Sequence, residues 1–282
     1  MTKQAALNIA DYTSPETMDK LAEILDGVIE NIQTSAVSEV LKNTNGSGNP
    51  EGGSVEYKRF ANAELVDKGT AREAGAGAKV KAKPIIININ DDKEIIEELQ
   101  FKDVKLYGID GMAEKRKTNF AKRVVAYLDR KFFGAAVAEG TQFERGSLTA
   151  EKEILDAMIV KAKETKSAFI DGIDAEDLAI VVGGKFRKAV KNELDALPNG
   201  TQASNGAIGV YDGIEVYESN RMPKGVNCII MLKGSIALPR VISDYSAEKV
   251  PFDDAIALET FVYSGVGALS PEAIIYDKDL TI

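Results

Sequence analysis

Apolar residues recur at intervals of three and four positions near the start of the chain. Residues 15–42 carry this stripe from Leu21 to Ile32, which predicts one amphipathic helix. Ser14 can cap its first turn, and Pro15 suits the first helical position because no N–H is needed there. A helix with one apolar face has to pack on something, so we expect it to dock on a surface outside its own segment.

A stretch rich in Gly, Asn and Ser follows this helix. Its sequence, NTNGSGNPEGG, occupies residues 43–53 and is typical of a flexible hinge. We therefore interpret residues 1–53 as an arm and hinge that is tethered loosely to the rest of the chain.

Two segments with β-strand residues flank a long tip of small side chains. Strands are predicted at residues 54–66 and 79–90, and Pro84 favours an edge position because it cannot donate to a neighbouring strand. The tip, which begins DKGTAREAGAGAK at Asp67, has almost nothing that could build a core. A two-stranded ribbon is only marginally stable in water, so this long hairpin needs a partner surface.

The longest helical pattern covers residues 111–139. Its apolar residues recur at every fourth position, at Phe120, Val124, Leu128 and Phe132. At about 1.5 Å per residue it would span roughly 40 Å, which is long for a globular helix. It has seven basic and three acidic residues, a pattern that also occurs in nucleic-acid-binding helices, but the spacing of its aromatic residues favours a core role.

Shorter elements alternate in the second half of the chain. A helix with Ser147 as its cap precedes a buried strand at residues 178–182. Asp212-Gly213 predicts the two-residue turn of a β-hairpin. Further buried strands are predicted downstream, which gives an α+β pattern with no internal repeat.

The composition excludes several classes of function. The 282 residues include no His and no Trp, which excludes a Ser-His-Asp triad and a His-ligated metal. The net charge of −9 disfavours gripping nucleic acid with the surface as a whole. The single cysteine, Cys228, lies in the apolar run VNCIIML and is interpreted as a core residue. No window approaches 18 apolar residues, so we expect no transmembrane helix and a protein of the reducing cytoplasm.

Two kinds of pattern could carry chemistry, and both are interpreted as structural. Gly183-Gly184-Lys185 follows a strand and opens a helix, but a phosphate-binding loop needs a longer loop and a hydroxyl residue after the lysine. Three acidic clusters could offer oxygen ligands to a divalent cation, but none has the spacing of a calcium loop. The clusters are Asp91-Asp92 with Glu94, Asp171 through Asp177, and Asp253-Asp254. We therefore predict no metal, no cofactor and no catalytic residue.

Charge is segregated along the chain. Residues 1–54 have three Lys and eight acidic residues (net −5), and residues 241–282 have two Lys and eight acidic residues (net −6). Residues 55–90 have seven basic and four acidic residues (net +3). Any one of these runs is equally well explained as a solvated face. Together they suit a surface that meets copies of itself, basic patch on acidic patch.

Two segments of the second half of the chain resemble segments of a known protein family. IGVYDGIEVYESNRMP, residues 208–223, is similar to a segment of the axial domain of phage capsid proteins, and SGVGALSPEAIIYDK, residues 264–278, looks like their last peripheral strands. An arm, a glycine-rich hinge, a long two-stranded loop and a long helix precede them. Over residues 15–278 the chain resembles the major capsid protein of tailed bacteriophages, which has the HK97-type fold.

The resemblance implies an α+β chain with the parts of an HK97-type capsid protein. The parts are an arm and hinge (1–53), an extended loop (54–95), a spine helix with part of a peripheral domain (96–146), mainly an axial domain (147–240) and the peripheral return strands (241–282). In this family the extended loop and the arm lie over neighbouring subunits. The hairpin would then lack a core because other copies supply it.

The resemblance also implies a structural function without catalysis or cofactors. Hexamers and pentamers of the chain would form an icosahedral shell around double-stranded phage DNA, in the cytoplasm of a host bacterium and without a membrane. A separate scaffolding protein and a portal would be partners. The candidate inter-subunit contacts are basic residues of the extended loop, namely Arg59, Lys68, Arg72, Lys79 and Lys81.

Two alternatives stay open at this point. A nanocompartment shell of the encapsulin type shares the fold and would hold a protein cargo instead of DNA. A carboxylate-based enzyme or a metal-binding domain would form a small, discrete oligomer with a tight ion site. The absence of His and Trp disfavours this last hypothesis.

Overall fold

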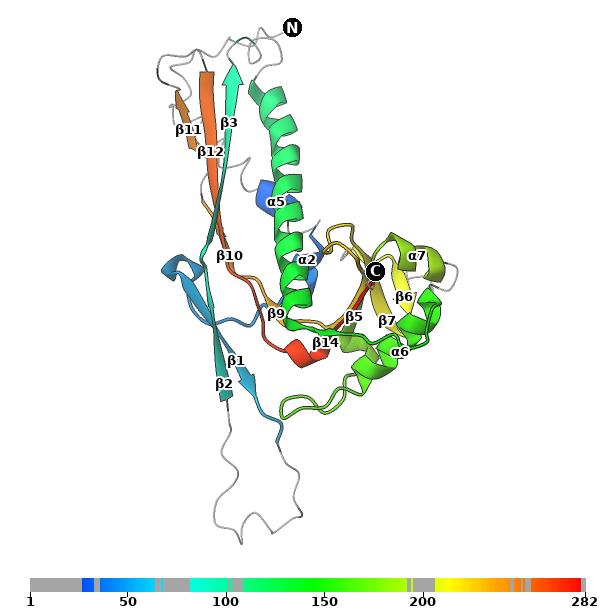
Figure 1. Cartoon of the computed structure of the whole chain (residues 1–282). Coiled ribbons are helices and arrows are strands. Elements are labelled where there is room, and N and C mark those ends of the chain that lie inside the picture. Colours follow the sequence, from blue (N-terminus) through cyan, green and yellow to red (C-terminus); the bar gives the residue numbers. More distant parts are fainter. Residues whose placement is uncertain are drawn as a thin grey trace.

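The computed structural model describes residues 27–32, 36–63, 82–100, 109–191, 206–243, 246–249 and 255–279, together with the single residues 67, 102, 194 and 251. This part of the chain is an α+β structure with a body and two extensions (Figure 1). A long sheet accompanied by a long helix leaves the body in one direction, and a β-hairpin leaves it in the opposite direction.

The described elements are mostly strands. The helices are α2 (Val37–Leu41), α5 (Ile109–Glu139), α6 (Glu151–Lys163) and α7 (Gly184–Val190), with 3-10 turns at Pro50–Gly52, Ala175–Asp177 and Pro271–Ala273. The strands are β1 (Ser54–Phe60), β2 (Ala82–Asn88), β3 (Asp91–Gln100), β4 (Thr141–Gln142), β5 (Leu178–Val182), β6 (Gly209–Tyr211), β7 (Ile214–Glu218), β8 (Val226–Leu232), β9 (Ile236–Ala237), β10 (Arg240–Ile242), β11 (Ser246–Lys249), β12 (Ala255–Ser264), β13 (Gly267–Ala268) and β14 (Ile274–Lys278). Within the described ranges, no helix has the length and apolar content needed to cross a membrane.

The body is a six-stranded sheet with both faces covered. Its strand order is β4-β14-β8-β5-β7-β6. Ala179 and Val181 of β5 belong to the apolar cluster that includes α2 and α5, whereas Leu178, Ile180 and Val182 belong to the cluster that includes α6 and α7. A strand buried on both faces is apolar at every position, which explains the continuous run of β5 and confirms the predicted buried strand.

Two local predictions in the body are confirmed. Asp212 (φ 50°) and Gly213 (φ 78°) form the turn between β6 and β7, and two successive positive φ values are what a two-residue hairpin turn requires. Cys228 of β8 is fully buried, and burial raises the pKa of its thiol. Cys228 is therefore a core residue.

The second sheet is long and narrow, and α5 runs along it (Figure 1). Strand β12 pairs over its whole length with β3, and on its other side with β10 and β11. The hydroxyl of Tyr127 donates to Asp91 (2.8 Å), and Lys131 forms an ion pair with the same carboxylate (2.7 Å). The helix α5 begins two residues before its predicted start and ends at its predicted end, and Phe120 and Phe132 are buried as predicted.

The hairpin β1–β2 is a separate two-stranded sheet. Its register runs from Ser54 opposite Asn88 to Phe60 opposite Ala82. The predicted strands are confirmed over these residues. They are too long at residues 61–63 and 89–90, which are described and lie outside a strand, while residues 64–66 and 79–81 lie outside the described residues. The next strand, β3, belongs to the long sheet, so the pairing of the extended loop ends before residue 91.

The arm differs from its prediction in two ways. Residues 27–32 are helical and α2 follows, but Ala36 between them has extended backbone (φ −91°, ψ 122°), so a continuous helix over residues 15–42 is wrong. Ile32, Ala36 and Leu41 are buried in the same cluster as α5. The described part of the arm therefore docks on the chain's own body, and the prediction that it docks on a neighbouring subunit is wrong for these residues.

The glycine-rich segment that follows is held in place. The N–H of Asn43 donates to the carbonyl of Ile236 (2.8 Å), and Ser47 and Glu56 exchange backbone hydrogen bonds (2.8 and 2.9 Å). Two of its glycines have positive φ, so its composition reflects turn geometry. The prediction of a flexible hinge at residues 43–53 is therefore wrong.

Two further predictions are corrected by the body. The N-cap of α6 is Ala150, without a side-chain cap, and Ser147 lies in the preceding turn. Strand β14 lies between β4 and β8, so it belongs to the body and not with the return strands assigned to 241–282. The reason is that Ile274 and Ile275 alternate between the two covered faces of the six-stranded sheet.

Candidate inter-subunit surfaces

The hairpin β1–β2 packs one of its faces on the body. Val55, Tyr57 and Ile87 are buried against Ala237 and Leu269. Since side chains alternate along a strand, the neighbouring positions point away from the body. The hairpin therefore has a second face that the described residues do not cover.

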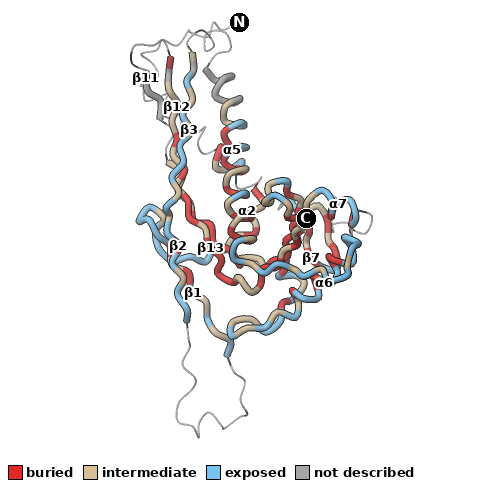
Figure 2. The backbone as a smooth tube through the Cα atoms, viewed as in Figure 1, coloured by how far each residue is buried: buried red, intermediate tan, exposed pale blue. Residues whose placement is uncertain are grey.

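This second face is apolar with one exposed ion pair, and we call it the hairpin outer face (Glu56, Lys58, Phe60, Pro84 and Ile86). Lys58 lies opposite Pro84 in the register, with Phe60 and Ile86 on the same face to either side. The exposed fractions of Phe60 and Ile86 are 58% and 63%. Figure 2 shows the exposure of this extension. Large apolar side chains at such exposure mark an interaction surface when they lie together.

Arg59 lies on the opposite side of β1 and has partners within the chain. Its guanidinium donates to Glu272 (2.5 Å) and lies 4.3 Å from the ring centroid of Phe169. Burial raises the pKa of Glu272, but the hydrogen bond and charge of Arg59 outweigh it and leave the pKa below its usual value. Arg59 thus ties the hairpin to the body.

The other four predicted contact residues, Lys68, Arg72, Lys79 and Lys81, lie outside the described residues. Their contact role, and any contact of Arg59 with a second copy, stays a prediction. The internal partner of Arg59 is not predictable from local sequence, because Glu272 is more than two hundred positions away.

Replacing Arg59 by alanine is expected to lower the free energy of unfolding by about 1–2 kcal/mol, because Glu272 loses its charged donor. The matched control is Lys58→Ala. Its ion pair with Glu56 is long (3.6 Å) and exposed, so the expected change is within about 0.5 kcal/mol. Urea denaturation of both variants measures the difference, and equal losses would show that Arg59 does not anchor the hairpin.

The long sheet exposes an acidic face. Along β3, side chains that face α5 alternate with side chains that point away from it. Glu97 faces the helix and accepts a hydrogen bond from Arg116, whereas its neighbour Ile96 points away and is 53% exposed. In the register, the stacked rings of β12 (centroids 6.2 Å apart) lie opposite acidic residues of β3. We call this set the sheet outer face: Asp92, Glu94, Ile96, Glu98, Phe261 and Tyr263.

The sequence does not predict the sheet outer face, because it does not indicate a strand at β3. Six of its ten residues are acidic or basic, so the period-two alternation is hard to see in the sequence. The feature of the sequence that points to this face is the acidic cluster at the start of β3, Asp91-Asp92 with Glu94. Asp91 of that cluster is used within the chain, where the hydrogen bond from Lys131 holds the pKa of its carboxyl well below the usual range.

Buried ion pairs attach α2 to the body, and we call them the arm anchor (Ser38, Glu39, Asp129, Arg221 and Arg240). The fully buried carboxylate of Asp129 accepts from the N–H of Ser38 (3.0 Å) and from Arg221 (2.7 Å). Nearby, Arg240 donates to Glu39 (3.2 Å) with both side chains almost buried. The anchor explains why the described part of the arm lies against its own body.

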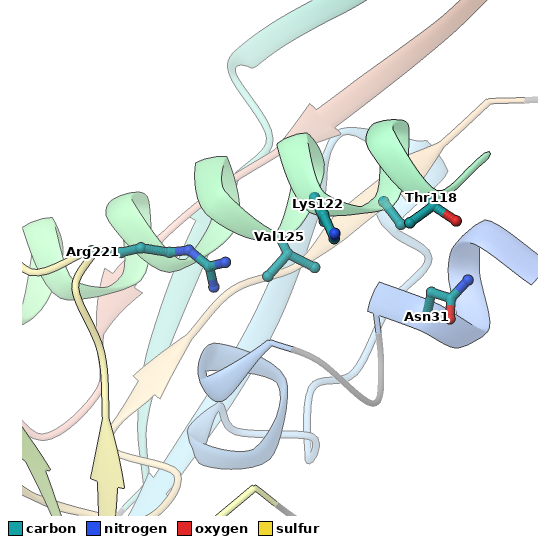
Figure 3. Close-up of a pocket in the computed structure, with 6 residues that line it drawn as sticks. Asn31, Thr118, Lys122, Val125 and Arg221 are labelled. Carbon is teal, nitrogen blue, oxygen red and sulfur yellow. The ribbon is translucent and has the colours of Figure 1, made fainter. Parts of the chain in front are cut away.

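A pocket lies between the arm and α5 (Figure 3). Its volume is about 260 Å³, and its lining consists of Asn31, Thr118, Ala121, Lys122, Val125 and Arg221. In Figure 3, Lys122 and Val125 extend from α5 toward the helical segment that carries Asn31. The pocket thus combines an apolar floor with cationic and polar side chains.

Charged residues of the Gly-Gly-Lys motif and of the acidic clusters have partners within the chain. Lys185 forms an ion pair with Asp279 (2.8 Å), and this contact holds the pKa of Asp279 at about 2. Lys166 pairs with Asp171 at the surface. Within the described ranges, no group of three His, Cys, Asp or Glu side chains is placed to hold a metal ion.

Comparison with known proteins gives matches of structure alone. No family model and no curated protein matches the sequence. The structure from Mycobacterium phage Che8 has a TM-score of 0.56 at 14% identity, over 80% of this chain and 84% of that one. The capsid of cyanophage P-SCSP1u has a TM-score of 0.58 at 13% identity, over 88% and 89%. The virus-like particle from Pyrococcus furiosus has a TM-score of 0.57 at 14% identity, over 92% and 98%.

Proposed function

We propose that this chain, which has the HK97-type fold of phage capsid proteins, forms the shell of a tailed-phage head. Many copies assemble through weak contacts that add up, and the shell encloses double-stranded DNA. The role is structural, without catalysis or a cofactor. The shell is assembled in the host cytoplasm, with a separate scaffolding protein and a portal, and becomes part of the virion.

One observation carries this proposal: the two extensions expose apolar side chains at places that the body cannot reach. Phe60 and Ile86 lie on the hairpin outer face, and Ile96 lies on the sheet outer face. Since the two extensions point in opposite directions, neither can cover the other within one chain (Figure 1). A second copy can cover them, and such a contact between unlike patches propagates from copy to copy.

The charges of these two faces support the same conclusion. On the hairpin outer face Lys58 and Glu56 form an exposed ion pair and leave no net charge, whereas the sheet outer face carries Asp92, Glu94 and Glu98. Repulsion between acidic side chains disfavours a contact between two sheet outer faces, so the uncharged hairpin outer face is the better partner for this acidic face.

A second candidate function is a shell that encloses a protein cargo, as in a nanocompartment. The structural similarity to the virus-like particle from Pyrococcus furiosus, which extends over 92% of this chain, supports this alternative. The contents of purified particles separate the two. Nuclease-protected DNA supports the phage head, and a co-purifying protein at fixed stoichiometry supports the nanocompartment.

The proposal is tested by expressing the chain alone and with candidate scaffolding proteins from neighbouring genes. Negative-stain electron microscopy and sedimentation velocity are expected to show closed shells, tubes or capsomer-sized rings. A discrete monomer or dimer under all of these conditions, together with tight binding of a divalent cation, would contradict it and favour the metal-binding or enzymatic hypothesis.

A further inference from the structure

We propose that the solvent-facing side of α5 binds the phosphate backbone of the enclosed nucleic acid, through a cationic strip made of Lys122, Arg123 and Arg130. This inference rests on the proposed shell function. It adds a partner for one surface of the chain and predicts which side of the subunit faces the interior of the shell.

The first observation is that these three cations have no acidic partner among the described residues. Elsewhere in the described residues, arginines are held by carboxylates, as Arg145 is by Asp277 (2.5 Å) and Arg221 by Asp129 (2.7 Å). The three residues of the cationic strip are exposed, and the described part of the chain offers them no ion pair. The described part of the chain therefore does not neutralise their charge, which is what binding of an anionic partner requires.

The second observation is their placement on one side of the helix. At about 100° per residue, positions 122, 123 and 130 lie within one third of the helix circumference. Asn119 and Ala126 lie between them, and the described residues of this side include no exposed acid. The buried side of the same helix holds Phe120 and Phe132, so its aromatic residues serve the core and its basic residues face solvent.

The third observation is the pocket beside the strip. Lys122 belongs to both, and Arg221, which is held by Asp129, also lines the pocket (Figure 3). Thr118 and Asn31 add polar side chains to the lining. Cations together with hydroxyl and amide groups are the side chains that contact phosphate oxygens in complexes with nucleic acid.

The choice of nucleic acid over an acidic protein follows from what the strip lacks. Protein interfaces have an apolar centre, and the exposed large apolar side chains that the structure describes are Phe60, Ile86, Ile96 and Val160, none of which lies on α5. Phosphate contacts need only cations and are indifferent to sequence. A strip of three cations per copy, repeated over a shell, gives weak binding at each point and strong binding in total.

The test compares two triple variants of the full chain that change the net charge equally. K122Q/R123Q/R130Q removes the cationic strip. K188Q/K191Q/K224Q removes three other exposed cations, two on or next to α7 and one before β8, for which no ion pair is described. Fluorescence anisotropy of a labelled 24-base-pair duplex, at salt concentrations from about 20 to 200 mM, measures the binding of unassembled chains.

The unaltered chain and the control variant are expected to bind with the same salt dependence. The strip variant is expected to bind at least about tenfold more weakly at low salt, with a log–log salt slope that is smaller by about two to three, since each phosphate contact contributes about 0.9. Equal losses in both variants, or no binding by the unaltered chain, would overturn the inference.

Electron microscopy of the same variants separates this inference from the proposed function. The strip variant is expected to form shells of normal shape, with less nuclease-protected nucleic acid per shell than the control. If it forms no shells while the control does, the strip contacts another protein chain and the inference is wrong, although the shell function stands. If the unaltered chain forms no shells under any condition, the proposed function itself fails.

Discussion

Replacing both Phe60 and Ile86 by serine is expected to abolish shell formation while the chain stays folded. The two side chains are 58% and 63% exposed and lie on the hairpin outer face, so they contribute little to the folded monomer. Covering each one in a contact with a second copy stabilises that contact by roughly 1.5–3 kcal/mol. Losing both weakens each contact by a factor of hundreds or more, and every copy in a shell makes that contact.

The measurement is sedimentation velocity with electron microscopy, under the conditions in which the unaltered chain assembles. Circular dichroism and thermal unfolding verify that the double variant is folded. Val160→Ser is the matched control, because Val160 is 53% exposed but lies on α6 of the body, away from both extensions. Closed shells at normal yield from the double variant would remove the main support for the proposed assembly contact.

The parts of this fold that could be predicted from the sequence are those that local patterns determine. The turn at Asp212-Gly213 follows from two residues that tolerate positive φ, and the buried strand β5 follows from five consecutive apolar residues. The long helix α5 follows from apolar residues at every fourth position, and its observed and predicted ends agree within two residues.

The parts that could not be predicted depend on partners far away in the sequence. The pairing of β3 with β12 joins residues about 165 positions apart, and the sequence of β3 is too charged to indicate a strand. The arm was expected to leave the body because its own segment offered no partner. That partner is Asp129, which lies ninety-one positions from Ser38. In the sequence, a buried aspartate in a basic helix cannot be distinguished from a solvent-exposed one.

This aspartate gives the second large prediction. Asp129→Ala is expected to lower the free energy of unfolding by about 3–5 kcal/mol, because it leaves the buried N–H of Ser38 and the guanidinium of Arg221 without their acceptor. Asp129→Asn retains an acceptor for Ser38 and lets the partly exposed Arg221 turn to solvent, so its cost should be clearly smaller. The control Asp156→Ala removes an exposed acid that accepts from Tyr211, with an expected loss below about 1.5 kcal/mol.

The position of the loss should also be visible, because the arm anchor holds α2 more than it holds the six-stranded sheet. Hydrogen exchange is expected to rise first in residues 37–42 of the Asp129→Ala variant, while β5 and β8 stay protected. Adding Arg221→Met should change the stability little, because the side chain of Arg221 is partly exposed and its charge can turn to solvent. If exchange instead rises evenly over the body, Asp129 supports the whole core, and the arm is attached by its apolar contacts alone.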